Sequence, residues 1–158
     1  MTFNESIITI LIAFIAGIVA LYQVKSNVIS SARIKWIEDL RLALCEYYDS
    51  ALRSTLYLED GEGFKKLGFS DETTFTRLEE HHSRYHLNSN KIRMLLNPNE
   101  KQHADLIEIM DIIDQFYLQE NVQQISQEKV EEKLKDIVEI SRNIMKTEWD
   151  KSKKILPI

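Results

Sequence analysis

The sequence is poor in the residues that form turns and cross-links. Its 158 residues include only four Gly, two Pro and one Cys. The scarcity of Gly and Pro argues against a turn-rich β-sandwich or a low-complexity chain, and a single Cys excludes a disulfide scaffold and a four-cysteine zinc site. The length is typical of one domain. We therefore expect an all-α protein.

Basic residues are absent from the start of the chain. All 20 Lys and Arg lie at or beyond Lys25, and the segment before Lys25 carries one charge, that of Glu5. Residues 7–24 read IITILIAFIAGIVALYQV, which is 18 residues without a charge. A helix of this size is about 27 Å long, close to the thickness of the hydrocarbon core of a bilayer. We expect residues 1–26 to form a single transmembrane helix, followed by a cytoplasmic helical bundle over residues 27–158.

A signal peptide and a soluble core helix both fit the apolar segment less well than a span. A secretory signal peptide opens with positively charged residues, whereas MTFNES supplies only the terminal amine, and no Ala-x-Ala cleavage site follows. A core helix of a small soluble domain normally keeps a polar face. Lys25, Arg33 and Lys35 lie on the C-terminal side of the segment. The positive-inside rule therefore places the N-terminus outside and the rest of the chain in the cytoplasm.

Apolar residues after the span recur at the spacing of amphipathic helices. A helix is expected from Ala32 to near Leu58, and the Ser- and Asn-rich residues 26–33 either separate it from the span or lie within one long helix. Residues 59–72 contain three of the four glycines and are expected to form the main loop. Ser70 or Asp71 is the expected N-cap of the next helix.

Three more helices complete the expected four-helix bundle. The first of these runs from about Glu72 to Leu96 and could break at Asn88 to Asn90. The second begins at Asn97 and Pro98, and the apolar spacing of the third continues until Pro157. The expected core positions are Ile37, Leu40, Leu44, Tyr47, Ala51, Leu52, Phe75, Leu78, Tyr85, Ile92, Leu95, Leu106, Ile107, Met110, Ile113, Phe116, Tyr117, Val130, Leu134, Ile137, Val138, Ser141, Ile144, Met145 and Trp149.

Motifs of the common soluble enzymes are missing, but one histidine cluster remains. In RLEEHHSRYH, Arg77 and His82 have R-x4-H spacing, and such a pair could cleave RNA, with His as general base or acid and Arg stabilising the phosphorane charge. On a regular helix the two lie on different faces, so a local distortion or a second copy would have to bring them together. His82 and His86 could hold zinc from one helix face, with Glu79 nearby, but such a site needs a third ligand to which the sequence does not point. A solvated polar face is the simpler interpretation, and no metal or cofactor is expected.

Small residues recur within the expected span. Ala13-x3-Gly17 and Ala16-x3-Ala20 form two small-x3-small pairs on neighbouring faces, a spacing that lets membrane helices approach closely. A helix with two such faces can contact two neighbours in a closed ring, although the same pattern also serves a dimer. The sequence therefore predicts a homo-oligomer.

Polar side chains near the N-terminus are candidates for a pore lining. A ring of spans that turns Asn4, Ser6 and Thr9 inward would let water and ions pass. The net charge of -5 argues against non-specific binding of nucleic acid. The expected partners are the lipid bilayer and other copies of the chain.

The layout also resembles a known class of proteins. It resembles the small single-pass membrane proteins of bacterial mobile elements and defence loci. The segments that carry this resemblance are the uncharged N-terminal span, RIKWIEDLR at residues 33–41 and LLNPNEKQH at residues 95–103. The size, the span and the pair of Arg77 and His82 are similar to those of the membrane-bound accessory proteins of type VI-B, RNA-targeting CRISPR systems. The resemblance implies an inner-membrane pore that strengthens antiphage defence, a body related to HEPN ribonuclease domains, and a CRISPR effector or phage-derived trigger as partner. Leu78 replaces the polar residue that follows the Arg in such ribonucleases, which argues against nuclease activity.

These patterns together predict an oligomeric membrane protein that forms a pore or perturbs the membrane, with no catalytic residue. Two alternatives stay open. One is a membrane-tethered HEPN-like ribonuclease that uses Arg77 and His82, and the other is a non-enzymatic anchor or adaptor for a cytoplasmic partner.

Overall fold

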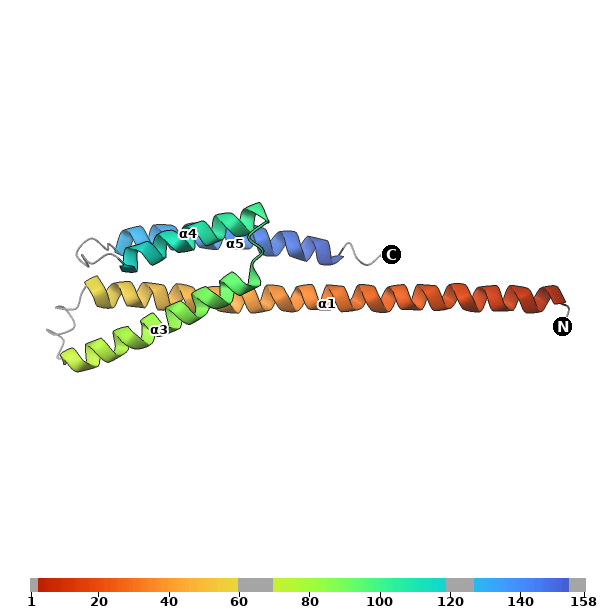
Figure 1. Ribbon diagram of the computed structural model, residues 1–158, viewed down its shortest axis with the longest axis horizontal. Coiled ribbons are helices and arrows are strands. Elements are labelled where there is room, and N and C mark those ends of the chain that lie inside the picture. Colours follow the sequence, from red (N-terminus) through yellow and green to blue (C-terminus); the bar gives the residue numbers. More distant parts are fainter. Residues whose placement is uncertain (1–2, 60–69, 119–126, 154–158) are drawn as a thin grey trace. The chain divides into compact units, whose positions relative to one another are not determined.

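The chain is helical through nearly all of the part that the computed structural model describes, residues 3–59, 70–118 and 127–153. These ranges hold four helices and no strand (Figure 1). The helices are α1 (Phe3–Glu59), α3 (Asp71–Leu95), α4 (Lys101–Leu118) and α5 (Gln127–Lys153). The prediction of an all-α protein is confirmed.

The chain divides into two compact units, which we describe separately. The N-terminal unit comprises residues 1–37 and 147–158, and the bundle unit comprises residues 38–146. Helices α1 and α5 each contribute to both units. Of the two alternatives for residues 26–33, the structure has the one long helix: they lie inside α1, and no Gly or Pro interrupts the chain between Gly17 and Gly61.

The serines of this segment lie at a contact between α1 and α5 within the N-terminal unit. Ser26 is buried, and the hydroxyl of Ser30 donates a hydrogen bond to the carbonyl oxygen of Ser152 at 3.3 Å. Close by in the chain, Arg33 forms an ion pair with Glu148 at 2.8 Å. Small hydroxyl side chains thus allow the last turns of α5 to approach α1, and they do not end the helix.

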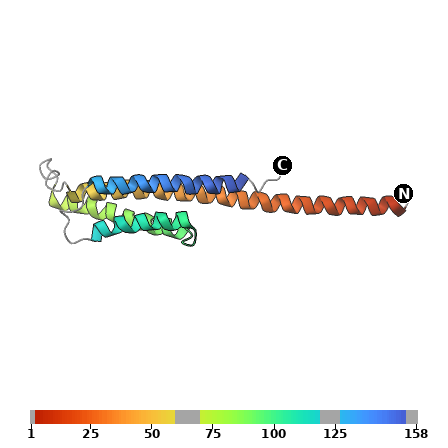
Figure 2. The same ribbon diagram turned by 90° about the horizontal axis from the view of Figure 1, so that it is seen from above.

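The bundle unit is an antiparallel arrangement of four helical segments. Along the chain, the second half of α1, then α3, α4 and α5 run in alternating directions (Figures 1 and 2). The buried apolar residues of this unit are Leu40, Ala43, Leu44, Tyr47, Ala51, Tyr85, Ile92, Leu96, Leu106, Met110, Ile113, Val130, Leu134, Ile137 and Ile144. Most of the core positions expected from helical spacing are therefore buried or half-buried.

Two expected core residues are exposed. The side chain of Phe75, in the first turns of α3, is 65% exposed. Trp149, in the N-terminal unit, is 43% exposed, and its ring lies 5.2 Å from the ammonium nitrogen of Lys153. The prediction of a core position was wrong for both side chains.

The ends of the helices follow local hydrogen bonds. Ser70 is the N-cap of α3, as predicted, and its hydroxyl accepts a hydrogen bond from the amide of Thr73 at 3.1 Å. Helix α3 does not break at Asn88, whose side-chain amide donates to the carbonyl oxygen of Arg84 at 3.0 Å. The expected loop at residues 59–72 falls mostly on residues 60–69, which lie outside the described part of the chain.

The start of α4 was predicted one turn too early. The helix begins at Lys101 and not at Pro98, because residues 97–100 form a separate turn in which the amide of Glu100 donates to the carbonyl oxygen of Asn97 at 3.0 Å. The backbone amide of Asn97 donates to Nδ1 of His103 at 3.0 Å. Asn97 therefore stabilises a turn rather than the first turn of the helix.

Candidate functional site

The first half of α1 presents a bare apolar surface. Every residue from Ile7 to Lys25 is exposed, and Leu21 reaches 74% exposure. Within the described part of the chain, α1 is the one helix that is long and apolar enough to cross a membrane, and none of its most apolar stretch is buried. A helix that belonged to the core of a soluble domain would be mostly covered.

A narrow stripe of α1 carries the small and hydroxyl-bearing residues of this surface. At about 100° per residue these side chains fall within an arc of roughly 100° around the helix axis. The small-residue stripe consists of Ser6, Thr9, Ala13, Ala16, Gly17 and Ala20. A Cβ atom added at Gly17 would meet no atom within 4 Å, so this face is open within the chain. Asn4 belongs to α1, but its side chain lies outside the described part.

A chain of polar groups, buried at its tyrosines and partly exposed at its charged residues, joins three helices of the bundle unit. The hydroxyl of Tyr47 on α1 donates to the hydroxyl of Tyr85 on α3 at 3.3 Å, and the Tyr85 hydroxyl donates to the carboxylate of Asp114 on α4. Arg93 on α3 binds the same carboxylate at 2.8 Å and that of Asp111 at 2.7 Å. We call these five residues the tyrosine–aspartate network.

A second contact ties α4 to α1 beside this network. The hydroxyl of Tyr117 donates to the carbonyl oxygen of Ala51 at 2.6 Å and lies 2.9 Å from the hydroxyl of Thr55. The rings of Tyr117 and Tyr85 are 4.8 Å apart at their centroids, in an edge-to-face arrangement. The polar ends of these aromatic side chains are thus satisfied where the helices pack together.

Burial keeps the three tyrosines neutral. It raises the pKa of Tyr47, raises that of Tyr85 further with help from the neighbouring Tyr47 and Asp114, and raises the pKa of Tyr117 to about 12. Burial disfavours the charge of Arg93, but hydrogen bonds and charge interactions with its two aspartates outweigh this effect and raise the pKa of Arg93. The network therefore links the three helices through paired donors and acceptors.

Arg77 and His82 are not brought together within one chain. Helix α3 runs unbroken through both positions, so five residues separate the side chains by about 140° around the axis. Arg77 is exposed, whereas His82 is half-buried, with its ring 5.8 Å from that of Tyr117. Burial and the neighbouring His86 lower the pKa of His82 against an opposing effect of Asp114. Contact between Arg77 and His82 would need a second copy.

The histidines form a pair without further ligands. The Nε2 atoms of His82 and His86 are 3.0 Å apart, and Glu79 is exposed on the same helix. Among the residues whose side chains the structure describes, no three His, Cys, Asp or Glu side chains are placed to hold a metal ion.

Sequence reasoning identified the three tyrosines only as core positions and missed their polar partners. Asp111 and Asp114 lie one turn apart among the apolar positions of α4, and Arg93 lies next to the buried Ile92. Carboxylates close to a buried helix face are a signal for a buried cation or hydroxyl donor. That signal was available from spacing alone.

Comparison with protein-family models, with curated proteins and with solved structures gives no match for this chain.

Proposed function

We propose that the chain is a single-pass membrane protein whose spans associate through the small-residue stripe and whose bundle unit lies in the cytoplasm. The exposed, uncharged helical surface from Ile7 to Val24 carries the proposal. Removing one Ile or Leu side chain from water stabilises a protein by about 1.5–3 kcal/mol, so a bilayer that covers this surface is strongly favoured over water. The helix also satisfies its own backbone hydrogen bonds, as a span must.

The distribution of charge supports the orientation. Lys25 and Lys35 are exposed just after the apolar surface, and no basic residue precedes it. The positive-inside rule then places the N-terminus outside and the bundle unit in the cytoplasm.

The small-residue stripe supports self-association. In lipid, helices gain little from apolar burial against each other, and contacts through small residues and hydroxyl groups decide which faces meet. The stripe combines both kinds of residue on one face, and the open surface at Gly17 leaves room for a second helix.

A pore and a role in antiphage defence are the finer parts of the proposal. Several spans that meet through the stripe would bring the hydroxyls of Ser6 and Thr9 together, and a ring of them would form a polar path. The resemblance to membrane-bound accessory proteins of type VI-B CRISPR systems supports the defence role. Expression with a potential-sensitive dye should show depolarisation, and intact defence with unchanged potential would contradict the pore.

The membrane location is tested by a single charge. Ile15→Lys places an ammonium near the middle of the apolar stretch, where insertion of a charge costs about 2.5–3.5 kcal/mol. We expect alkaline carbonate washing to release a larger fraction of the variant than of the wild type from the membrane pellet. Met94→Lys, the same change at an 82% exposed position of α3, is the control and should stay in the pellet. Equal release of wild type and Ile15→Lys would contradict a membrane span.

Self-association is tested at the glycine of the stripe. A Cβ atom at Gly17 would meet no atom of its own chain within 4 Å, so a loss of assembly in Gly17→Leu would report on contacts between copies. Val19→Leu, which lies about 160° around the helix from Gly17, is the matched control. Native mass measurement in mild detergent should show oligomers for the wild type and the control and a shift to monomer for Gly17→Leu. A monomeric wild type would refute the association.

A further inference from the structure

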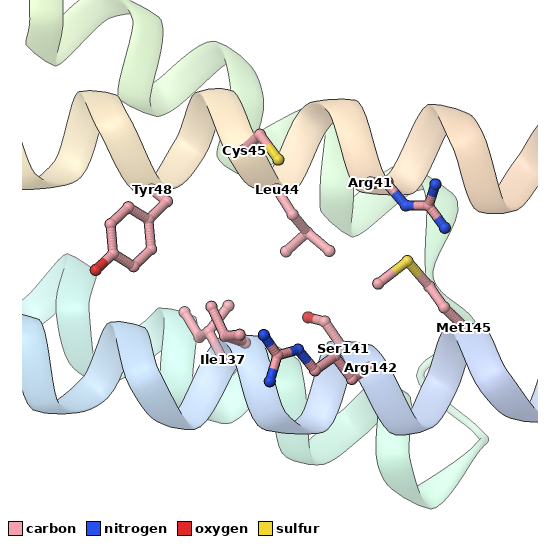
Figure 3. A pocket seen from close by; sticks show the side chains of 9 residues that line it. Arg41, Leu44, Cys45, Tyr48, Ile137, Ser141, Arg142 and Met145 are labelled. Atoms are coloured by element: carbon pink, nitrogen blue, oxygen red, sulfur yellow. The ribbon is translucent and has the colours of Figure 1, made fainter.

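A half-open groove of about 570 Å³ lies between α1 and α5 within the bundle unit (Figure 3). Its apolar surface comes from Leu44 on α1 and from Ile137, Val138 and Met145 on α5. Figure 3 shows Leu44, Ser141 and Met145 projecting into the space between the two helices. The volume is within the range of about 300–1,000 Å³ that is usual for sites of small organic ligands.

Two arginines that line the groove have no acidic partner within the described part of the chain. Arg41 on α1 and Arg142 on α5 line the groove and are exposed, and neither forms an ion pair with any described residue. Other arginines of the chain do form such pairs, and these are Arg33, Arg53, Arg84 and Arg93. Among the residues that line the groove, the only charged ones are these two arginines, so the groove combines an apolar floor with positive charge, which is complementary to an anion.

A buried hydroxyl at the groove also lacks a partner. Ser141 is only 3% exposed, and its Oγ atom finds no hydrogen-bond partner among the described residues. Buried hydroxyl groups are normally paired, and an unpaired one next to a cavity is free to donate to an oxygen atom of a ligand.

The positive character continues beyond the apolar part. A neighbouring hollow of about 440 Å³ shares Tyr48 and Arg142 with the groove, and it is also lined by Lys135 and Glu139. Arg142 and Lys135 outnumber the single carboxylate there. An elongated ligand could thus place its apolar portion between Leu44 and Met145 and an anionic group near Arg142.

We propose that this groove binds an amphipathic anion, a carboxylate or phosphate group joined to an acyl chain. The arginines supply the charge, Ser141 supplies a hydrogen-bond donor, and the apolar floor covers the chain. A free fatty acid and an anionic phospholipid share this chemistry. The proposal is independent of self-association and of a pore.

The test uses the only cysteine of the chain as reporter. Cys45 lines the groove and is exposed, so its alkylation by N-ethylmaleimide can be followed in the full-length protein without any substitution. The protein is placed in nanodiscs of neutral phosphatidylcholine, and oleate is added. We expect oleate to slow alkylation at least fivefold at saturation. Oleyl alcohol, which has the same chain without the charge, and inorganic phosphate, which has charge without the chain, should each have less than a twofold effect.

A second arm distinguishes the two sources of the ligand. Nanodiscs that contain phosphatidylglycerol should protect Cys45 without added oleate if the ligand is a phospholipid of the bilayer. Protection by oleate alone assigns the groove to free fatty acids, and protection in both arms supports a site for either.

Variants separate binding in the groove from general effects. Arg142→Ala should raise the half-protecting concentration of oleate about tenfold, as expected for the loss of one charge-assisted hydrogen bond. Ser141→Ala should raise it about threefold while leaving the thermal stability of the free protein equal or higher, because an unpaired buried hydroxyl is removed. Arg84→Ala, which removes an equal charge on α3, is the control and should change nothing. Circular dichroism at 222 nm verifies that each variant is folded.

Several outcomes would overturn the proposal. These are protection by oleyl alcohol equal to that by oleate, equal protection in wild type and in Arg142→Ala, and no protection by either lipid. Protection by an acidic amphipathic peptide but by neither lipid would assign the groove to a protein partner instead.

Discussion

Replacing Asp114 with Asn tests whether the tyrosine–aspartate network holds the bundle unit together. In the wild type the carboxylate accepts hydrogen bonds from the Tyr85 hydroxyl and from Arg93. An amide of the same shape keeps one acceptor oxygen but turns an NH₂ group toward one of the two donors. One donor therefore loses its partner, and Arg93 keeps only the ion pair with Asp111.

The size of the effect follows from the burial of the carboxylate. The side chains of Asp114 and Arg93 are each 27% exposed, so solvent screens the ion pair in part. A hydrogen bond to a charged group contributes about 1.5–3 kcal/mol in such settings, and the retained oxygen offsets part of the loss. We expect Asp114→Asn to lower the free energy of unfolding by about 2 kcal/mol. For a chain of this length that corresponds to a fall in Tm of about 4–8 °C.

Thermal unfolding of the full-length protein in detergent, followed by circular dichroism at 222 nm, measures the change. Asp49→Asn breaks an exposed ion pair with Arg53 on α1 and is the matched control, with an unchanged Tm. A double-mutant cycle with Tyr85→Phe adds a second criterion, because groups joined by a hydrogen bond should show a coupling energy of about 0.5 kcal/mol or more. A fall in Tm below 1 °C for Asp114→Asn, or strictly additive effects in the cycle, would refute the role of the network.

Three further predictions concern pH and the N-terminal unit. The pKa of His82 is lower in the folded chain, so the unfolded chain binds a proton first as the pH falls below about 6.5, and stability should decline there. His82→Gln should make this decline shallower in urea unfolding at pH 5–7, and equal slopes for variant and wild type would contradict the prediction. Burial raises the pKa of Tyr117 to about 12 in the folded chain, whereas an unfolded tyrosine ionises near 10, so stability should fall as the pH rises above 10. Tyr117→Phe should lose less stability between pH 8 and alkaline pH than the wild type does, as measured by circular dichroism. Glu148→Gln weakens the ion pair with Arg33 and should raise amide hydrogen exchange in the last turns of α5 by about threefold, whereas unchanged exchange would show that the pair contributes nothing.

Helical spacing predicted most of the core because the burial of apolar side chains dominates there. The positions that recur every three or four residues in the last helix, such as Val130, Leu134 and Ile137, are buried in the structure. The N-cap at Ser70 could also be predicted, since a side-chain oxygen just before a helix accepts a hydrogen bond from a backbone amide whatever the rest of the fold does. Both signals are local or strictly periodic.

Errors arose where two local preferences competed. Pro98 fits the first turn of a helix, but the hydrogen bonds of Asn97 to Asn99 and of Asn97 to His103 favour a separate turn, and the second of these bonds spans six residues. Asn88 and Asn90 suggested a break, yet Asn88 bonds back to the preceding turn and leaves α3 intact. Spacing cannot rank such alternatives, because the difference depends on partners in other turns.

The candidate sites were predictable to different extents. The apolar face of α1 was evident from the absence of charge, whereas the groove at Arg41 and Arg142 depends on residues about 100 positions apart in the chain. The network of Asp114 likewise requires three helices to meet. Contacts of this kind follow from tertiary packing, and no motif records them.

The coincidence of small and hydroxyl-bearing side chains on one stripe of α1 has a consequence for the proposed association. In an assembly that forms through this stripe, the same few positions set both the contact distance and the polarity of the contact. A substitution at Gly17 that separated two copies would then also turn the hydroxyl of Ser6 toward lipid, where polar atoms are costly to place. One substitution in the stripe would therefore weaken the contact between copies and change its polarity at the same time. Variants that change only one of these two properties would be disfavoured.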